Sequence, residues 1–397
     1  MRHFDVIIVG AGPVGLSLAK TLSMNDLTVL LIEQQDEASI TAPKFDGREI
    51  ALTHASKQFM EKLGFWNQIP SDAISPMLDA RVFNGTSLFA LKIDHDDVAK
   101  EALGFLVSNH LIRRAAYEIV KQDARVKLLT ESKVAKVKIQ PSYVSVMLEG
   151  GECIEAQLLV AADSRFSETR RAMGISADMH DFGKTMMVCQ MQHEKSHQHS
   201  AWEWFDYGQT LALLPMNGQQ SSVVLTLSAM EMNDLMHMPE EQFNQAITKR
   251  FKNRLGKMQL VSTRHAYPLV TAYAKRMISE RFVLVGDAAV GMHPVTAHGF
   301  NFGLKSIDSL MQAISWAKQH HLDIAAPQAL QSYEQQHRKN TRPLFLATHA
   351  IAKLYNDDRL PARIIRTGAL RLSHFVKPFK RQLAGFLSEP HNTQGLT

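Results

Sequence analysis

Phe4-Asp5-Val6-Ile7-Ile8-Val9-Gly10-Ala11-Gly12-Pro13-Val14-Gly15 stands at the start of the chain. Its wholly apolar part, 6–9, predicts a short strand buried on both faces, as strands of parallel sheets usually are. Three glycines follow at the spacing G-x-G-x-x-G, and a helical stretch, 16–23, comes next. At this spacing the first glycine makes a tight turn, the second admits a pyrophosphate, and the third lets the helix pack on the strand. The stretch predicts a dinucleotide-binding unit.

A second apolar run, 28–32, predicts the neighbouring strand and ends in Glu33, which Gln34 follows. An acid about 20 residues after the glycines is placed to bind the ribose of an adenosine. The alternative is a tight strand-to-helix turn followed by an ordinary surface glutamate. The strand before the glycines and the helix after them favour the dinucleotide, and either NAD or FAD fits this stretch alone.

Composition indicates a globular protein with a sizeable core. The 397 residues predict two lobes, or two domains with a tail, and the apolar content is 45%. The net charge is +5, but no basic tract with interleaved aromatics is present, so we expect no nucleic-acid partner. Cys153 and Cys189 lack metal-ligand spacing, which predicts no metal site and fits a reducing compartment. We expect neither a secretory signal nor a membrane-spanning segment, so the predicted location is the cytoplasm.

Two strand-rich regions interrupt the parallel pattern. Alternating runs in 125–163 predict a three-stranded meander that returns to the parallel sheet, and 185–227 predicts a mainly antiparallel sheet. The second region is rich in methionine and aromatic residues, which suits an apolar substrate, although core packing explains the composition equally well. The substrate-facing residues predicted in this sheet are Met187, Trp204, Leu213 and Pro215.

Polar groups follow three further predicted elements. A buried strand, 282–285, ends in Gly286 and Asp287, and a carboxylate there needs donors such as sugar hydroxyls. Arg48 follows a turn signal, where a guanidinium can clamp a phosphate; a solvated surface arginine is the alternative. Asn109 lies at the predicted start of a helix, 110–122, in which Arg113 falls on the first turn.

Three motifs in register give the chain its family resemblance. They are Gly10-Ala11-Gly12-Pro13-Val14-Gly15, then Ala162-Asp163-Ser164-Arg165-Phe166-Ser167-Glu168-Thr169-Arg170, and finally Gly286-Asp287-Ala288-Ala289 with His293-Pro294 and Gly299-Phe300-Asn301. With them the chain resembles the group A FAD-dependent aromatic hydroxylases of the para-hydroxybenzoate hydroxylase fold. Within that family it looks most like the ubiquinone-biosynthesis hydroxylases, and among these most like the demethoxyubiquinol hydroxylase branch.

The resemblance implies a fold and a reaction. The fold is α/β, with a Rossmann-like FAD-binding domain on a parallel sheet, a mainly antiparallel substrate domain and a C-terminal helical segment. The reaction is hydroxylation of the ring of a prenylated quinol through a flavin C4a-hydroperoxide, with NAD(P)H and O2 as co-substrates. The implied domain boundaries are 1–75, 106–183 and 271–340 for FAD binding, 76–105 and 184–270 for the substrate domain, and 341–397 for the tail.

The resemblance also assigns roles to single residues. FAD-binding residues are Gly10, Gly12, Pro13, Val14, Gly15, Glu33, Gln34, Arg48, Asn109, Arg113, Val134, Asp163, Ser164, Gly286, Asp287, Pro294, Gly299, Phe300 and Asn301. His293, Pro294 and His298 are the implied catalytic residues, and Val295 and Thr296 are implied to contact substrate. For His293, a structural ring beside Pro294 is an equally good interpretation. Two positions depart from the family pattern: Ser164 replaces a glycine, and His298 replaces a glutamine.

Several alternatives stay open at this point. A polyprenyl reductase of the same fold, as in the geranylgeranyl reductases, and a non-catalytic flavin-bound subunit of a biosynthetic complex are the rival functions. Trp202-Glu203-Trp204 resembles part of a flavin halogenase motif, but alternation along a strand explains the tryptophans better. The basic amphipathic tail predicts either packing on the flavin lobe or peripheral contact with an anionic membrane, such as the inner face of the cytoplasmic membrane, or with a partner protein. A homo-oligomer is also compatible with the sequence.

Overall fold

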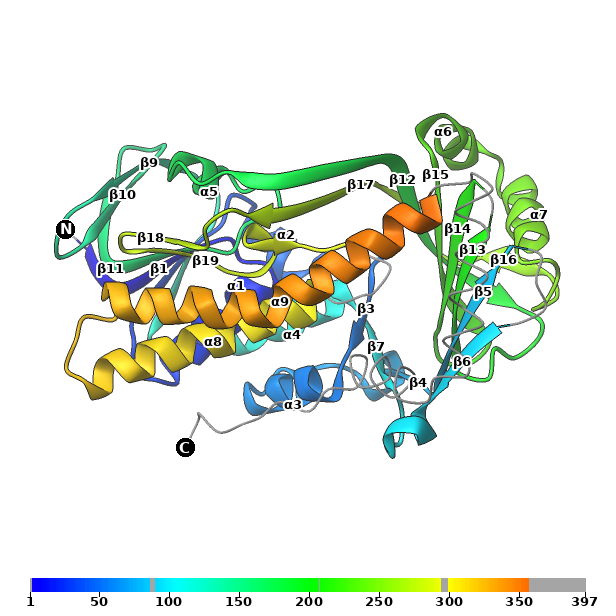
Figure 1. The fold of residues 1–397 in the computed structure, drawn as a ribbon, viewed down its shortest axis with the longest axis horizontal. Coiled ribbons are helices and arrows are strands. Elements are labelled where there is room, and N and C mark those ends of the chain that lie inside the picture. Colours follow the sequence, from blue (N-terminus) through cyan, green and yellow to red (C-terminus); the bar gives the residue numbers. More distant parts are fainter. Residues whose placement is uncertain (1, 86–89, 207, 294–298, 357–397) are drawn as a thin grey trace.

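The computed structural model describes residues 2–85, 90–206, 208–293 and 299–356. Among these residues the strands form three sheets, of eight, nine and three strands. Figure 1 shows the eight-stranded and nine-stranded sheets in two lobes, with the long strand β12 (Ala177–His193) running from one lobe to the other. The predicted α/β class, with one largely parallel sheet and one mainly antiparallel sheet, is confirmed.

The first lobe is built on the eight-stranded sheet, in the order β18-β19-β11-β1-β2-β8, with β10 joined to β11 and β9 joined to β10. Strands β19, β11, β1, β2 and β8 are parallel, because helical or long connections link them. The bounds are β1 (Arg2–Val9), β2 (Val29–Ile32), β8 (Val126–Leu129), β9 (Val134–Ile139), β10 (Val144–Leu148), β11 (Cys153–Ala161), β18 (Ile278–Ser279) and β19 (Phe282–Leu284). The meander predicted within 125–163 is β9-β10-β11, as expected.

Helices cover the first sheet and supply its core. Helix α1 (Pro13–Ser23) follows β1 directly, while α8 (Gly299–Gln319) and α9 (Pro327–Asn356) lie side by side along the lobe (Figure 1). The core extends from β1 through α1 to α8, with Ile7, Leu16 and Leu310 fully buried. The other helices are α2 (Glu37–Thr41), α3 (His54–Lys62), α4 (Asn109–Val120) and α5 (Glu168–Ala172).

The second lobe is the nine-stranded sheet, in the order β20-β17-β12-β15-β14-β13-β5-β6, with β16 joined to β12. Its strands come from three separate parts of the chain: β5 (Asp79–Asn84), β6 (Ala90–Asp94), β12, β13 (Ser200–Asp206), β14 (Gln209–Pro215), β15 (Gln220–Ser228), β16 (Met258–Leu260), β17 (His265–Ala274) and β20 (Val290–Gly291). Helices α6 (Ala229–His237) and α7 (Glu240–Arg250) pack on one face and enclose a second core. The predicted domain boundaries themselves stay a prediction.

A small sheet links the lobes. It consists of β3 (Glu49–Leu52), β7 (Gly104–Ser108) and β4 (Ser75–Met77), and the strand pairs are antiparallel. The short 3-10 helices are η1 (Trp66–Gln68), η2 (Ser71–Ala73), η3 (His95–Val98) and η4 (Gly286–Ala288).

Candidate functional site

A pocket of about 1860 Å³ lies between the two lobes. One end is lined by the glycine turn and by Glu33, and the other end by the inner face of the nine-stranded sheet. Pockets for one small ligand usually measure about 300–1,000 Å³. The pocket therefore has room for an extended cofactor and a second molecule beside it.

The glycine turn is closed on its inner side and open toward the pocket. Gly10 has φ +107°, in the left-handed region that favours glycine, and a Cβ on Gly15 would lie 1.9 Å from the Gly10 carbonyl oxygen. Gly12, the residue before α1, has no atom within 4 Å of the position of a Cβ and lines the pocket. A phosphate can thus approach the first N–H groups of α1 along the Gly12 side.

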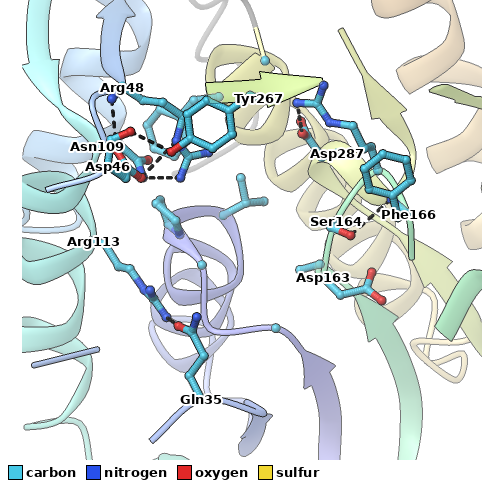
Figure 2. A pocket seen from close by; sticks show the side chains of 18 of the residues that line it. Gln35, Asp46, Arg48, Asn109, Arg113, Asp163, Ser164, Phe166, Tyr267 and Asp287 are labelled. Atoms are coloured by element: carbon cyan, nitrogen blue, oxygen red, sulfur yellow. Dashed lines mark hydrogen bonds and ion pairs between the residues drawn. The ribbon is translucent and has the colours of Figure 1, made fainter. Parts of the chain in front are cut away.

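The next part of the pocket combines a fixed carboxylate with an unused donor. The Glu33 carboxylate is buried and accepts the Ala11 N–H at 2.8 Å and the Gln35 N–H at 3.0 Å. Arg113 donates through Nη2 to the Gln35 side chain at 2.7 Å (Figure 2). Its buried Nε has no hydrogen-bond acceptor among the described residues, and burial lowers the pKa of Arg113. This N–H donor is available to a ligand.

Arg48 belongs to a polar cluster that connects the lobes (Figure 2). Its Nε donates to the Asp46 carboxylate at 3.0 Å, and the Asn109 amide donates to the same oxygen at 2.8 Å. The Tyr267 hydroxyl, from β17, donates to the Asp46 carbonyl at 2.7 Å. Burial alone would raise the pKa of Asp46, but the hydrogen bonds and charge of Arg48 outweigh it and hold the pKa below its ordinary value. Arg48 is therefore an oriented cation at the pocket wall.

The opposite wall carries the residues of the second and third motifs (Figure 2). Asp287 accepts a hydrogen bond from Arg165 Nη2 at 3.0 Å, and Arg165 Nη1 donates to the Val270 carbonyl at 2.8 Å. Asp163 accepts the Ser167 hydroxyl at 2.9 Å through one oxygen, while its buried Oδ1 accepts nothing from the described residues. The Ser164 hydroxyl accepts the Phe166 N–H at 3.2 Å, so this departure from glycine is tied to its own turn. A buried carboxylate oxygen without a donor indicates a ligand hydroxyl.

Together these walls suit an extended dinucleotide. The open glycine turn fits a pyrophosphate, the spare Arg113 N–H fits an acceptor, and the Asp163 oxygen fits a hydroxyl donor. The residues therefore fit FAD along the length of the pocket.

Most of the predicted FAD residues line the pocket. They are Gly10, Gly12, Pro13, Val14, Glu33, Gln34, Arg48, Asn109, Arg113, Val134, Asp163, Ser164, Asp287, Gly299 and Phe300, and His293 lines it too. Gly15, Gly286 and Asn301 lie behind the lining and support it. Asn301 accepts the Thr53 N–H at 3.2 Å and donates to the Ala51 carbonyl at 2.8 Å, which ties α8 to the small sheet. Pro294, Val295, Thr296 and His298 fall outside the described residues.

The substrate-facing prediction in the nine-stranded sheet needs a correction. Met187, Trp204 and Leu213 are fully buried in the core beneath α6 and α7, and Pro215 is also buried away from the pocket lining. Side chains alternate between the faces of a strand, so the neighbouring residues line the pocket instead. These neighbours are Met186, Val188, Glu203, Phe205, Ala212 and Leu214. The period-two alternation is present as predicted, and these residues occupy its core face, as the alternative of core packing states.

His293 is held as a neutral ring. Burial lowers its pKa to about 4, and the nearby His349 and Arg165 act in the same direction. The ring of Phe182 contacts it edge to face at 4.9 Å between centroids. At neutral pH the imidazole is therefore uncharged at the pocket wall.

The residues that sequence reasoning missed are Asp46, Glu49, Arg165, Glu203 and Tyr267, all in the pocket lining. Arg165 stands inside the second motif, so its proximity to a ligand was indicated although its pairing with Asp287 was not. Asp46 and Tyr267 are 221 residues apart, and no local pattern predicts their contact.

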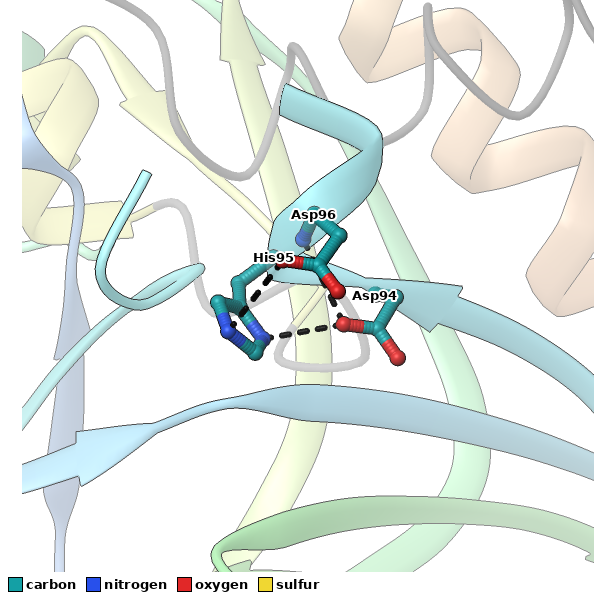
Figure 3. Close-up of side chains that lie close together, drawn as sticks. All are labelled: Asp94, His95 and Asp96. Atoms are coloured by element: carbon teal, nitrogen blue, oxygen red, sulfur yellow. Dashed lines mark hydrogen bonds and ion pairs between the residues drawn. The ribbon is translucent and has the colours of Figure 1, made fainter. Parts of the chain in front are cut away.

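Asp94, His95 and Asp96 bring three ligand-type atoms within 4.8 Å at the end of β6 (Figure 3). His95 Nδ1 lies 2.9 Å from Asp94 and 3.1 Å from the Leu78 carbonyl, and Lys92 forms an ion pair with Asp94. These hydrogen bonds and ion pairs explain why the three side chains lie close together.

Comparison with known proteins agrees with this geometry. A family model described as an FAD binding domain matches residues 3–344. The chain is 45% identical over 383 residues to ubiquinone hydroxylase UbiM of Neisseria meningitidis, covering 96% of this chain and 83% of that protein. The chain belongs to the FAD-dependent ubiquinone hydroxylases. The predicted cofactor, FAD, and the predicted enzyme class, a flavin monooxygenase, are confirmed.

Two further similarities concern the sequence and the fold of this hydroxylase. It is 32% identical to ubiquinone hydroxylase UbiL of Rhodospirillum rubrum, over 95% of this chain and 87% of that protein. Its fold matches the crystal structure of p-nitrophenol 4-monooxygenase PnpA from Pseudomonas putida, with a TM-score of 0.78 over 98% of this chain and 100% of that one, at 16% identity. Within the described part of the hydroxylase, none of the helices has the length and apolarity that a bilayer crossing requires. The predicted demethoxyubiquinol branch stays a prediction.

Proposed function

We propose that this hydroxylase adds an oxygen atom to the ring of a polyprenylated quinone precursor, with NAD(P)H as electron donor and O2 as oxidant. The observation that carries the proposal is the 45% identity to a ubiquinone hydroxylase along 96% of the chain. The pocket supports it, because its FAD-fitting end is continuous with a largely apolar sheet face. An apolar wall suits a ring that bears a polyprenyl chain.

The places of the FAD-lining residues in the pocket support the roles proposed for them. The Gly12 turn and the N-terminus of α1 would hold the pyrophosphate, and Glu33 with Arg113 would border the adenosine. Asp163 and Asp287 would bind hydroxyls of the ribityl chain on the opposite wall. Bound FAD supplies the redox chemistry, taking electrons from NAD(P)H and activating O2 for ring hydroxylation.

The protein supplies positioning and exclusion of water around the reacting ring. The neutral His293 imidazole adds no charge beside the ring, so it can donate or accept one hydrogen bond. Pro294, Val295, Thr296 and His298 keep their predicted places beside the flavin and substrate as part of this proposal. A mostly apolar wall limits water near the reacting atoms.

Deletion of the gene tests the function directly. Mass spectrometry of the quinone pool should show accumulation of a precursor that lacks one ring oxygen, and the wild-type gene should restore the pool. The variant Asp287→Ala, which is expected to lose FAD, provides the matched control and should not restore it. An unchanged quinone pool, or a product with a saturated prenyl chain in place of a new ring oxygen, would overturn the proposal.

Other expectations remain untested. The C-terminal segment, 357–397, lies outside the described residues, so its packing on the flavin lobe and its contact with a membrane surface or partner protein both stay predictions. The same holds for the cytoplasmic location, for homo-oligomer formation and for the choice between NADH and NADPH.

A further inference from the structure

The inner face of the nine-stranded sheet presents two rows of side chains to the pocket. Strand register aligns Val188 on β12 with Val224 on β15, Val224 with Ala212 on β14, and Ala212 with Glu203 on β13. The adjacent row is Met186, Thr226, Thr210 and Phe205. All eight residues line the pocket, and Glu203 is the one ionisable side chain among them. The apolar wall therefore carries a single carboxyl group.

This carboxyl group accepts no hydrogen bond and forms no ion pair with any residue that the structure describes. Its neighbours across the strands are Ala212 on β14 and Val82 on β5, both uncharged. Burial raises the pKa of Glu203 to about 8, and no charged group contributes to the shift. Glu203 is partly exposed in the pocket wall, so a bound molecule can reach its carboxyl, and covering that carboxyl with an apolar ligand that offers no donor would cost free energy. Such a group in a pocket wall calls for a ligand partner.

Glu49 provides the contrast within the same pocket. Burial raises its pKa to about 7, but its carboxylate accepts the Ser108 hydroxyl at 2.6 Å and the Gln190 amide at 3.0 Å. Glu49 is thus satisfied by the protein and joins β7 to β12. Glu203 has a similarly raised pKa, but no described residue donates a hydrogen bond to it.

We propose that Glu203 is a catalytic residue that hydrogen-bonds the ring hydroxyl of the substrate and takes its proton during hydroxylation, an inference that rests on the proposed function. In this step the ring O–H bond breaks, an O–H bond forms on the Glu203 carboxylate, and the electron pair stays on the ring oxygen. The resulting phenolate is richer in electrons at the positions ortho and para to that oxygen. Those positions are the ones that an electrophilic oxygen attacks.

The raised pKa suits this role. A phenol titrates near pH 10, so proton transfer to an ordinary glutamate is unfavourable by roughly 10⁵- to 10⁶-fold. Burial raises the pKa of Glu203 to about 8, which makes its carboxylate a stronger base than an ordinary glutamate. Because most of this carboxyl group is protonated at neutral pH, the minor ionised form is the one that takes the ring proton.

Substrate binding without turnover tests the hydrogen bond. FAD-loaded enzyme is titrated with 2-prenylphenol and with its O-methyl ether, and binding is followed by the change in flavin absorbance in the absence of NAD(P)H. Wild-type enzyme should prefer the phenol by about tenfold or more, because the ether cannot donate to Glu203. In Glu203→Leu the preference should disappear, so that the phenol and the ether bind about equally well. A wild-type preference retained by Glu203→Leu would overturn the proposal.

Turnover by Glu203→Gln separates binding from proton transfer. The amide oxygen still accepts a hydrogen bond, so KM should stay within about threefold, while kcat falls by about 10²- to 10⁴-fold for lack of a base. Glu241→Gln, an exposed change on α7, is the matched control and should leave both parameters unchanged. A Glu203→Gln enzyme with the wild-type kcat contradicts the role. If the wild-type enzyme binds neither compound, the proposed function fails and this inference fails with it. If the wild-type enzyme binds both compounds without preference, this inference alone fails.

Melting temperatures test whether the Glu203 carboxyl group stabilises the folded protein. The folded state holds the Glu203 proton more tightly than the unfolded chain, so this carboxyl lowers stability as pH rises from about 4.5 to about 8. Glu203→Gln and Glu203→Leu should therefore melt at or above the wild-type temperature, with the largest gain near pH 8. A lower melting temperature in both variants would assign Glu203 to the fold and overturn the proposal.

Discussion

Two alanine substitutions in the glycine turn should separate folding from FAD binding. Gly12 has φ −72° and ψ 175°, which any residue adopts, and nothing lies within 4 Å of the position of its Cβ. Gly15→Ala would place a methyl group 1.9 Å from the Gly10 carbonyl oxygen, whereas ordinary contact begins at 3.4 Å. The first change fills space in the pocket, and the second forces strand and helix apart.

The expected magnitudes differ accordingly. Gly12→Ala should change the stability of the apo-protein by no more than about 0.5 kcal/mol, as for an unstrained surface position. Its methyl group would crowd the pyrophosphate at a cost of about 1–3 kcal/mol, which weakens FAD binding by roughly 10- to 100-fold. Gly15→Ala should destabilise the apo-protein by about 3 kcal/mol or more, because backbone must move by more than an ångström.

Urea unfolding of the apo-proteins and FAD titration by quenching of flavin fluorescence measure the two effects. Gly12→Ala should unfold with the wild-type midpoint but need more FAD, and Gly15→Ala should unfold at a clearly lower urea concentration. Wild-type FAD affinity in Gly12→Ala would show that the cofactor does not approach this turn. Wild-type stability in Gly15→Ala would refute the close packing of α1 on β1.

Further predictions concern single residues. Asp287→Ala should purify without its yellow colour, and full retention of flavin would contradict the assigned ribityl contact. Trp204→Ala should lose about 3–5 kcal/mol in urea unfolding, because the indole fills the second core, while FAD affinity stays unchanged. Asn301→Ala should cost about 2–4 kcal/mol through the loss of three hydrogen bonds, two of them buried, measured in the same way. A disulfide reagent should titrate Cys153 rapidly and Cys189 only after unfolding, because burial raises the pKa of Cys189 to about 12; two fast thiols would contradict this.

Local signals predicted the architecture well. Continuous apolar runs became the parallel strands, the glycine turn became the β1-to-α1 connection, and the alternating run in 125–163 became the meander. Each of these patterns is encoded within a few residues, so no tertiary information is needed to recognise it. Several of the residues predicted to bind FAD line the pocket because they follow the ends of parallel strands, and their contact with FAD stays a prediction.

The face of the second sheet could not be predicted in this way. On β13, Trp202 and Trp204 alternate with Glu203 and Phe205, so both faces carry large apolar residues. One face packs under α6 and α7 and the other borders the pocket, and period-two alternation does not distinguish them. The cluster of Asp46, Arg48 and Tyr267 was missed because it depends on docking of the two lobes.

The side chain of Val14 has a consequence beyond the glycine turn. It stands on the first turn of α1, and Cβ atoms on Gly286 and Gly303 would lie 3.1 Å and 2.5 Å from its methyl groups. The two glycines leave just enough room for this one side chain, so Val14 fixes how closely α1 approaches η4 and α8. A bulkier residue at position 14 would push these three elements apart and change the shape of the pocket that they line.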